Sequence, residues 1–391
     1  MNPKQFMFIA GEASGDMLAA ELVSALRGKL PDARFFGAGG PRMAAAGVEL
    51  AFDMMQHSVI GISDVLRKYF KFRRLFNQLL KLAIERQPDA IIGVDYGGFN
   101  LRFGHAIKQY VRNHPGGWNP KIIQFVSPQV WASRPGRANS MAADYDLLLS
   151  IFPFEKDWYA KRVPKLRVEF VGHPMVGRFN SEGRVPRAPI SDNSGSRGAR
   201  PSENRILLLP GSRESELQRH LPPMLGALEL IQTQLPGVRA KMVLPNESLV
   251  QLAKSTGVTK EMEIQIGNLP QALAQADLAI ASTGTVTMEC AFFGVPTVAL
   301  YKTSWCTYQI AKRIVTVKSL TMPNLLANEE VFPEFVQGAA TPGNIAGAAL
   351  ELLQNEPRRI QIKKRLAEVI SSLGGPGANS RAAAVILSLF V

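Results

Sequence analysis

The sequence is poor in the residues that build disulfide frameworks and metal centres. Its 391 residues include two cysteines, Cys290 and Cys306, and five histidines that are scattered along the chain. Two cysteines are too few for a disulfide framework, and no cysteines and histidines cluster at zinc-site spacing. We therefore expect a protein of a reducing compartment that carries no metal and no other cofactor.

Long apolar runs are also missing. The N-terminal run, Phe6 to Ala10, is too short for the core of a signal peptide. The longest weakly charged stretch, Leu278 to Tyr301, is interrupted by two glycines, a glutamate and a proline, which does not suit a membrane span. The sequence therefore predicts a soluble protein, cytoplasmic if its source is bacterial.

Negative charge is the third scarcity. The chain has 45 Lys and Arg against 32 Asp and Glu, a formal net charge of +13. This balance favours anionic partners: nucleic acid, a phosphorylated substrate or anionic lipid. Because the chain has no RNA-recognition signature, basic tail or zinc-finger spacing, we expect no nucleic acid partner.

Short apolar runs alternate with helical patterns in both halves of the chain. The predicted buried strands are QFMFIA, AIIGV, KIIQFV, DLLLSIF and RVEFV in the first half, and RILLLP, AKMVLP, MEIQIG, DLAIA and PTVALY in the second. Strand and helix in alternation predict two α/β domains, each a doubly wound parallel sheet. Residues 181–204 are rich in Ser, Gly, Pro and Arg and predict a flexible linker. We therefore expect domains at 1–180 and 205–391, with a cleft between them. For the final helices, crossing back to the first domain or swapping between copies stays open.

Ligands of open parallel sheets bind beyond the carboxyl ends of the strands, so the loops after strands are the candidate sites. The loop after DLAIA consists of Ser282, Thr283, Gly284 and Thr285. It opens a helix whose N-terminus suits a diphosphate, and Glu289, about one turn further, could accept hydrogen bonds from a ribose. The alternative is that Ser and Thr only cap this helix and that Glu289 is solvated.

A second loop of this kind follows RILLLP, where Gly211, Ser212 and Arg213 open a helix. Arg213 could bind a phosphate through two parallel hydrogen bonds. The alternative is a surface arginine that pairs with Glu214 or Glu216. Two such loops in one half of the chain favour a single nucleotide site in the C-terminal domain.

Acids follow two strands of the N-terminal half. Asp95 stands at the carboxyl end of AIIGV, whereas Asp89 stands at the opposite end, where a turn residue is the better interpretation. Glu12, Ser14 and Asp16 follow the first strand, where they either cap a helix or face a ligand.

The loop VSPQVWASR follows the strand KIIQFV. It offers Gln129 and Trp131 to a sugar or an acyl chain, with ordinary loop packing as the alternative.

A basic amphipathic helix is predicted between Asp64 and Glu85. That interval contains no acid and six cations: Arg67, Lys68, Lys71, Arg73, Arg74 and Lys81. At 100° per residue one face carries Val65, Tyr69, Phe72, Phe76, Leu79 and Ala83. The apolar surface is widened by Leu66, Phe70, Leu75 and Leu82. This excess predicts an interfacial helix on anionic lipid; a core helix with a solvated basic face is the alternative.

Ten stretches in order carry a family resemblance. They are GEASGD, HSVIGISDVL, VDYGGFN, SPQVWA, FPFE, VGHP, LLPGSR, STGTVTMEC, GVPTVALYK and MPNLLANEEVFPEFVQ. With them the chain resembles the lipid-A-disaccharide synthase family over nearly its whole length, apart from residues 181–204. This family consists of GT-B glycosyltransferases of Gram-negative bacteria, which have two Rossmann-like domains facing across a cleft.

The resemblance implies a reaction and a location. UDP-2,3-diacylglucosamine donates its sugar, with inversion, to 2,3-diacylglucosamine 1-phosphate, and UDP and a β-1,6 disaccharide 1-phosphate result. The enzyme works at the inner face of the inner membrane. Arg213, Glu289 and Asn324 then line the UDP site, and the loop 282–285 lies near the diphosphate. Pairing of two copies through swapped C-terminal segments is a further implication.

One departure concerns the catalytic base. Many members have an acid just before the Phe of DYGGFN, where this chain has Gly98. We hypothesise that Asp95 takes the proton from the acceptor hydroxyl, with Glu12 or Asp16 as alternatives, and that Ser14 or Asp16 caps the helix after the first strand.

Two other functions stay open from the sequence. One is a different UDP-sugar enzyme on the same fold, such as an epimerase or a transferase with a soluble acceptor. The other is a non-catalytic protein that binds a nucleotide sugar or a lipid, which the glycine at 98 makes more credible.

Overall fold

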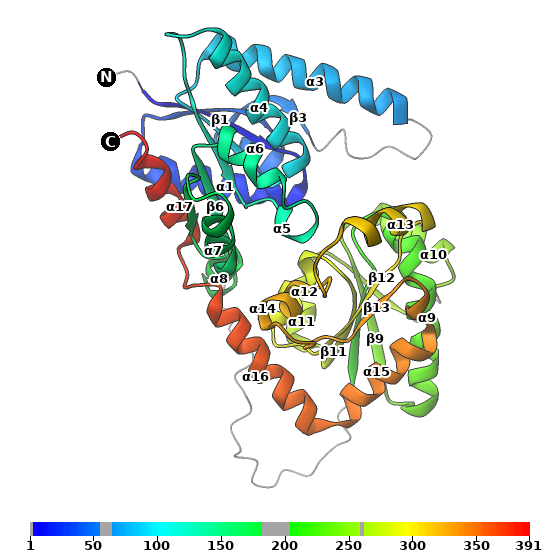
Figure 1. The fold of residues 1–391 in the computed structure, drawn as a ribbon. Coiled ribbons are helices and arrows are strands. Elements are labelled where there is room, and N and C mark those ends of the chain that lie inside the picture. Colours follow the sequence, from blue (N-terminus) through cyan, green and yellow to red (C-terminus); the bar gives the residue numbers. More distant parts are fainter. Residues whose placement is uncertain (1–2, 55–64, 182–203, 259–261) are drawn as a thin grey trace. The chain divides into compact units, whose positions relative to one another are not determined.

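Two parallel β-sheets, one in each half of the chain, organise the structure (Figure 1). The computed structural model describes residues 3–54, 65–181, 204–258 and 262–391, and of residues 65–71, 180 and 181 it describes the backbone alone. The chain divides into two units: residues 1–178 with 373–391 form unit 1, and residues 179–372 form unit 2. Two doubly wound parallel-sheet domains were the expectation, and the sheets confirm it.

Unit 1 contains a seven-stranded sheet in which every neighbouring pair is parallel. In spatial order its strands are β3 (Glu49–Asp53), β2 (Arg34–Gly39), β1 (Gln5–Ala10), β4 (Ala90–Val94), β5 (Lys121–Phe125), β6 (Leu147–Ser150) and β7 (Val168–Phe170). Its helices are α1 (Ala13–Lys29), α2 (Pro41–Ala45), α3 (Val65–Arg86), α4 (Gly97–Asn113), α5 (Val130–Ser133), α6 (Arg137–Asp144), α7 (Pro153–Arg162), most of α8 (Pro174–Ser181), and α17 (Ala378–Leu387). The strand order reverses direction between β1 and β4.

Unit 2 repeats the design with six parallel strands. In spatial order they are β10 (Glu263–Ile266), β9 (Arg239–Leu244), β8 (Arg205–Leu209), β11 (Leu278–Ser282), β12 (Thr297–Tyr301) and β13 (Glu334–Val336). The helices are α9 (Glu214–Gln234), α10 (Glu247–Ser255), α11 (Leu269–Gln275), α12 (Thr285–Phe292), α13 (Trp305–Ile314), α14 (Met322–Ala327), α15 (Pro342–Gln354) and α16 (Glu356–Ser372). Here the order reverses between β8 and β11.

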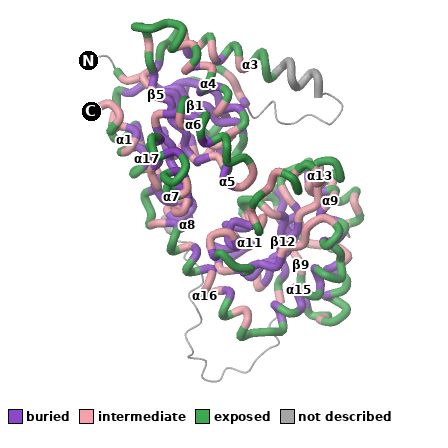
Figure 2. The backbone as a smooth tube through the Cα atoms, viewed as in Figure 1, coloured by how far each residue is buried: buried purple, intermediate pink, exposed green. Residues whose placement is uncertain are grey.

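The strands form because they are short apolar runs that can be buried on both sheet faces, and most of their residues are buried (Figure 2). Three strands lie outside the predicted set: β2, β3 and β13. β2 contains two glycines, β3 is a half-exposed edge strand, and β13 has three residues, so none is a continuous apolar run.

The final segment, residues 373–391, belongs to unit 1. The predicted second domain extends to residue 391, with crossing back of its final helices left open. Helix α17 packs on α1 of the same chain. There the carboxylate of Glu21 accepts hydrogen bonds from Arg178 and, at 3.0 Å, from the amide of Asn379. The aromatic ring of Phe390 lies edge-on to that of Phe6 at 6.0 Å. Pairing between copies through this segment stays a prediction.

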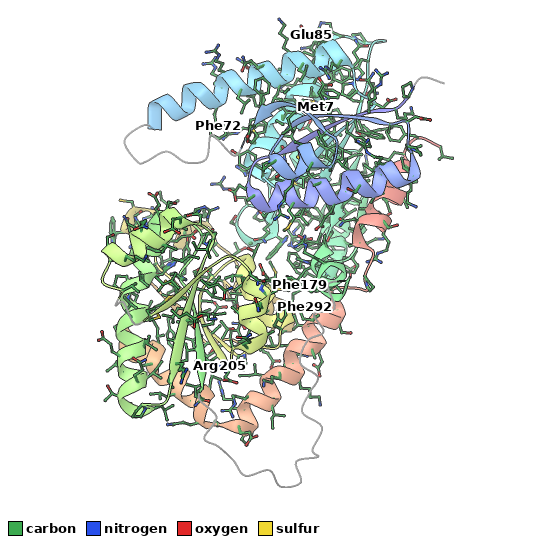
Figure 3. The ribbon with its side chains drawn as sticks, turned by 180° about the vertical axis from the view of Figure 1, so that it is seen from behind. Met7, Phe72, Glu85, Phe179, Arg205 and Phe292 are labelled. Carbon is green, nitrogen blue, oxygen red and sulfur yellow. The ribbon has the colours of Figure 1, made fainter. Side chains whose placement is uncertain are left out.

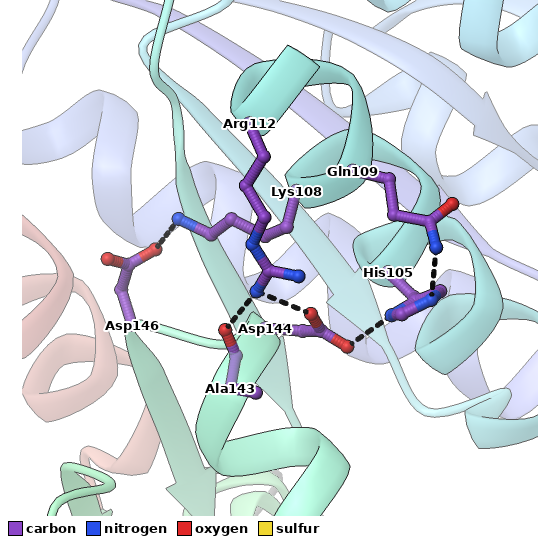
Figure 4. A network of polar contacts seen from close by, with 7 residues as sticks. All are labelled: His105, Lys108, Gln109, Arg112, Ala143, Asp144 and Asp146. Carbon is purple, nitrogen blue, oxygen red and sulfur yellow. Dashed lines mark hydrogen bonds and ion pairs between the residues drawn. The ribbon is translucent and has the colours of Figure 1, made fainter. Parts of the chain in front are cut away.

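Helix α4 is fixed against α6 and β6 by a polar network (Figure 4). The buried carboxylate of Asp144 lies 2.8 Å from Nδ1 of His105 and 3.4 Å from the guanidinium of Arg112. Nζ of Lys108 lies 2.9 Å from the carboxylate of Asp146. These contacts hold the helix whose first turn follows Asp95.

Helix α3 is anchored in unit 1 by the part whose side chains are described. Leu79 and Ala83 are fully buried, and Phe76 packs against the rings of Phe99 and Phe103 at 5.5 Å each. Phe72, marked in Figure 3, is 37% exposed and contacts Phe99. Phe76, predicted to face lipid, therefore faces the core of its own unit.

The side chains of five other residues predicted to face lipid are not described: Val65, Leu66, Arg67, Tyr69 and Phe70. Residues 182–203, which make up most of the predicted linker, are not described either.

Candidate active site in two strand-order reversals

The candidate residues of unit 1 gather where the strand order reverses. β1 and β4 are hydrogen-bonded neighbours, with Ala10 opposite Val94 at their carboxyl ends. Glu12 follows β1 and Asp95 follows β4, so both acids lie at one edge of the sheet. In doubly wound sheets the reversal of strand order is the place where ligands bind.

Two glycines allow the loops after β1 and β4 to approach each other closely. A Cβ at Gly11 would lie 2.3 Å from the ring of Tyr96, so only glycine fits there. A Cβ at Gly15 would lie 3.7 Å from the Cβ of Asp95 and 3.3 Å from the carbonyl oxygen of Val94. The glycines of GEASGD therefore bring the first turn of α1 against the loop that carries Asp95.

The backbone at this edge is strained. Asp95 and Tyr96 have φ angles of 51° and 46°, and Val126, after β5, has 66°. A left-handed conformation is unusual for a residue other than glycine, above all for β-branched valine. Such strain concentrates at functional sites, where the surrounding structure enforces it.

Two buried amides enforce the conformation of Asp95. The side chains of Asn100, from α4, and Gln124, from β5, each donate a hydrogen bond of 2.8 Å to the carbonyl oxygen of Asp95. Both side chains are almost fully buried. A carbonyl oxygen accepts two hydrogen bonds at most, so this one is saturated, and the two bonds fix the backbone at Asp95.

The electrostatics of the site favour a proton on Asp95. Burial raises the pKa of the Asp95 carboxyl, and the nearby carboxylate of Glu12 raises it further, against a smaller lowering by the backbone N–H of Tyr96. Burial and Glu12 also raise the pKa of the Tyr96 hydroxyl, to about 12. The carboxylate of Asp95 is therefore a stronger proton acceptor than an exposed aspartate.

Asp16 has a structural role. Its carboxylate accepts three backbone hydrogen bonds, from Gly40 at 2.8 Å, Arg42 at 3.0 Å and Met43 at 3.1 Å. It thus caps α2. The expectation that Ser14 or Asp16 caps the helix after the first strand is wrong: both lie inside α1, whose N-cap is Glu12 and has no side-chain cap.

The loop after β5 joins the same edge. A Cβ at Gly97 would lie 3.1 Å from Pro128, and Gln129, the N-cap of α5, is exposed. The indole of Trp131 is buried and donates a hydrogen bond of 2.9 Å to the carboxyl of Glu155.

Glu155 was not among the predicted site residues. It is fully buried in the first turn of α7, where the hydroxyl of Ser150 donates to it at 2.6 Å. Burial raises the pKa of this carboxyl to about 7, although its hydrogen bonds lower it. Acidic residues are common in the first turn of a helix, where they usually face solvent, so the motif FPFE did not indicate that the side chain of Glu155 is buried.

The loop after β8 holds Arg213 at the reversal of the second sheet. Nη1 of Arg213 lies 3.0 Å from the carboxylate of Glu216, which also accepts the backbone N–H of Ser212 at 3.1 Å. Gly211 has a φ of 127°, and a Cβ there would lie 2.6 Å from that carboxylate. A side-chain anion thus occupies the kind of place that a phosphate takes at a helix N-terminus.

The loop after β11, the neighbouring strand, opens α12. β11 extends to Ser282, one residue beyond the predicted end, and Ser282 is buried. Gly284, with a φ of 137°, is the N-cap and has no side-chain cap, so capping by Ser or Thr does not explain this loop. Thr285 is exposed, while Thr283 and Glu289 are half-buried.

Asn324 is committed to its own unit. Its amide group donates hydrogen bonds of 2.8 Å to the carbonyl of Phe332 and to Glu334, and its carbonyl oxygen accepts the backbone N–H groups of Val331 and Phe332. Every hydrogen-bonding position of the side chain is in use. A direct contact with UDP, which stays a prediction, would require part of this network to open.

His220 also escaped prediction, although it joins two loops of this edge. Its Nδ1 lies 2.7 Å from the carbonyl oxygen of Pro210, and its Nε2 accepts the backbone N–H of Lys302 at 2.9 Å. The ring is fully buried, and burial lowers its pKa. A neutral histidine thus ties the loop after β8 to the loop after β12.

No cluster of three or more His, Cys, Asp or Glu suited to a metal occurs among the described residues. None of the described helices is long and apolar enough to cross a bilayer.

Two doubly wound parallel sheets, with candidate loops at both strand-order reversals, are typical of the GT-B fold. The structure is similar to the UDP-GlcNAc 2-epimerase of Neisseria meningitidis bound to UDP-GlcNAc, with a TM-score of 0.61 and 11% identity, covering 98% of this chain and 100% of that chain. It is also similar to WaaG, a glycosyltransferase involved in lipopolysaccharide biosynthesis, with a TM-score of 0.50 and 13% identity over 98% and 99% of the two chains. At such identities the likeness concerns the fold alone.

The chain belongs to the lipid-A-disaccharide synthetase family, whose model matches residues 6–388. The lipid-A-disaccharide synthase of Trichlorobacter lovleyi is 37% identical over 392 residues, which cover 99% of this chain and 98% of the relative. That of Myxococcus xanthus is 35% identical over 393 residues, with coverage of 99% and 98%. The protein is therefore a glycosyltransferase of the lipid A pathway, as the resemblance of its motifs implied.

Proposed function

We propose that the protein transfers the sugar of UDP-2,3-diacylglucosamine to the 6-hydroxyl of 2,3-diacylglucosamine 1-phosphate, with inversion at the anomeric carbon. The bond from that carbon to the UDP oxygen breaks, the bond to the acceptor oxygen forms, and the acceptor proton passes to a base. The names of the full-length relatives support this reaction. The observation that carries the site is the gathering of the candidate loops at the two strand-order reversals.

Asp95 is the base in this proposal. Its carboxyl follows β4, the backbone that carries it is held by the amides of Asn100 and Gln124, and burial and Glu12 raise its pKa. A base of raised pKa accepts a proton from an alcohol more readily, provided that it is ionised at the working pH. Glu12 acts through its charge on Asp95, and Gln129 is positioned to bind the acceptor sugar.

Arg213 stabilises the leaving diphosphate. When UDP binds, the guanidinium of Arg213 and the backbone N–H of Ser212 leave the carboxylate of Glu216 and bind phosphate oxygens instead. The first turn of α12, which follows Ser282, Thr283 and Gly284, donates further N–H groups to the diphosphate. In the same proposal Thr285 borders the diphosphate, Glu289 accepts hydrogen bonds from the ribose, and Asn324 shapes the wall of the site.

The membrane assignment belongs to α3. Its anchored part presents Arg73, Arg74 and Lys81, which with Asn77 and Gln78 line a shallow surface hollow. Cations on an anchored helix are attracted to anionic lipid, with about 1 kcal/mol for each Lys or Arg near the surface. We place the enzyme at the inner face of the inner membrane, where both lipid substrates are anchored.

The test is turnover with both diacyl sugars, followed by detection of UDP and disaccharide 1-phosphate. Asp95→Asn should lower kcat about 100- to 10,000-fold, the usual effect of a lost general base. Asp89→Asn is the matched control, because Asp89 lies at the opposite end of β4 and accepts the N–H of Gln5 at 2.8 Å. If UDP binds and no disaccharide forms, the protein is a binding protein and the proposed reaction is wrong.

A double variant sharpens the assignment of the base. A Cβ at Gly98 meets nothing within 4 Å, so an aspartate fits there without strain. Gly98→Asp should restore part of the activity of Asp95→Asn, because it returns an acid to the first turn of α4. Full activity of Asp95→Asn alone would remove Asp95 from the reaction.

A further inference from the structure

Helix α13 of unit 2 presents an unusual outward face. None of its residues is buried. Trp305 is 72% exposed and Ile310 is 61% exposed, which makes them the most exposed large apolar side chains of the described residues apart from the C-terminal Val391. At 100° per residue the two side chains share one half of the helix with Cys306 and Arg313. Two such highly exposed apolar side chains on one short helix make α13 a candidate interaction surface.

The chain segment that contains α13 carries charge of one sign. No Asp or Glu occurs from Thr297 to Asn328, and this stretch contains Lys302, Lys312, Arg313 and Lys318. Lys312 and Arg313 form the last turn of α13, where cations also complement the helix dipole. The hydroxyl of Ser304 caps the helix by accepting the N–H of Thr307. The helix starts after β12 (Figure 1). It therefore stands at the edge of the sheet that carries the proposed UDP loops.

We propose that α13 is a second lipid-contacting helix, which inserts Trp305 and Ile310 among the headgroups of an anionic bilayer while Lys312 and Arg313 pair with lipid phosphates. The proposal rests on the proposed membrane association and extends it from unit 1 to unit 2. Tryptophan is favoured at the interface between headgroups and acyl chains, and the cations select an anionic surface. A second copy of the chain is a poor occupant, because two such faces would bring like charges together.

The native cysteines allow a local test. Cys306 is exposed on α13, whereas Cys290 is buried and its pKa is raised by burial to about 12, so a maleimide reacts with Cys306 alone. The full chain is labelled with a polarity-sensitive maleimide dye and mixed with vesicles of phosphatidylglycerol or of phosphatidylcholine. A blue shift with phosphatidylglycerol, and none with phosphatidylcholine, is the expected result. As a control, the dye is placed at Ile360→Cys in a Cys306→Ser background, where no shift is expected.

Substitutions give the second readout. Trp305→Ser with Ile310→Ser should weaken sedimentation with phosphatidylglycerol vesicles about tenfold, and Lys312→Glu with Arg313→Glu should do so as strongly. Ile360→Ser is the matched control, because Ile360 is 60% exposed and also belongs to unit 2. Circular dichroism of each variant establishes that the fold survives.

The outcomes separate the two proposals. Wild-type protein that sediments with vesicles while the Cys306 dye stays unshifted would overturn the role of α13 and leave that of α3. Protein that does not sediment with anionic vesicles would overturn membrane association and α13 with it. A shift that depends on protein concentration without vesicles would identify a second copy as the occupant, against the proposal.

Discussion

Replacement of Glu155 by glutamine should stabilise unit 1 relative to the wild-type protein, and this difference in stability should grow as the pH rises. Glutamine keeps the size of the side chain, its oxygen can accept the indole N–H of Trp131, and its amide can donate to the hydroxyl of Ser150. What it removes is a carboxyl whose pKa is about 7 in the folded protein and 4.5 ordinarily. Between these values the folded protein keeps a proton that the unfolded chain has lost, so wild-type stability falls with rising pH.

The size of the effect follows from the same two values. One pKa unit corresponds to 1.36 kcal/mol, and from pH 5 to pH 8 the wild-type protein should lose about 2.5 kcal/mol relative to the Glu155→Gln variant. Because the comparison is made within one pair of proteins, the titration of all other groups cancels.

Urea unfolding at pH 5, 6.5 and 8, followed by tryptophan fluorescence, measures this difference. Trp118, Trp131 and Trp158 belong to unit 1, and of the four tryptophans Trp305 alone belongs to unit 2, so the signal reports mainly on unit 1. Glu85→Gln is the control: Glu85 is an exposed glutamate of the same unit, 3.6 Å from Lys81, and its loss should change stability by about 1 kcal/mol or less at any of these pH values. Parallel stability curves for wild type and Glu155→Gln would refute the reasoning.

Three further predictions concern the reaction. Arg213→Ala should lower kcat about 100- to 1,000-fold with unchanged circular dichroism, because a donor to the leaving group is lost; near-normal turnover would exclude Arg213 from the site. Glu216→Gln should tighten UDP binding up to about fivefold by calorimetry, since it removes an exposed ion pair of about 0.2–1 kcal/mol with which the diphosphate competes; weaker binding would contradict this. Glu12→Gln should shift the acid limb of the kcat/KM profile to lower pH, because the carboxylate of Glu12 raises the pKa of Asp95; an unmoved limb would count against Asp95 as the base.

Local patterns predicted the fold well because buried parallel strands are written as continuous apolar runs. Such runs placed β1, β4, β5 and the strands of unit 2 up to β12 within a residue or two of their observed ends. β3 was missed because an edge strand buries one face, and β13 because three residues carry no periodicity. Two reversals of strand order cannot be read from such runs, since order depends on which strands pair.

The candidate site was predictable as a set of loops and not as a set of contacts. That Asp95 follows a strand is visible in the sequence, whereas the ring of Tyr96 over Gly11 joins residues far apart in the chain. The predicted contact of Asn324 with UDP came from the family resemblance. A resemblance identifies residues, but it does not show the hydrogen bonds that already occupy their side chains. Buried titratable groups such as His220 look like surface residues of amphipathic helices until their neighbours are known.

In the proposed mechanism the glycine at position 98 does not deprive the site of a proton acceptor, because Asp95 takes that role. An acid there would extend from an exposed residue in the first turn of α4. The backbone of Asp95 is held instead in a left-handed conformation by two buried amides, Gly15 leaves room beside its Cβ, and the charge of Glu12 acts on its carboxyl. Since burial and a like charge both raise a carboxyl pKa, we expect Asp95 to be a stronger base than an exposed aspartate. We therefore propose that Asp95 serves as the base in place of an acid at position 98, which the turnover of Asp95→Asn tests.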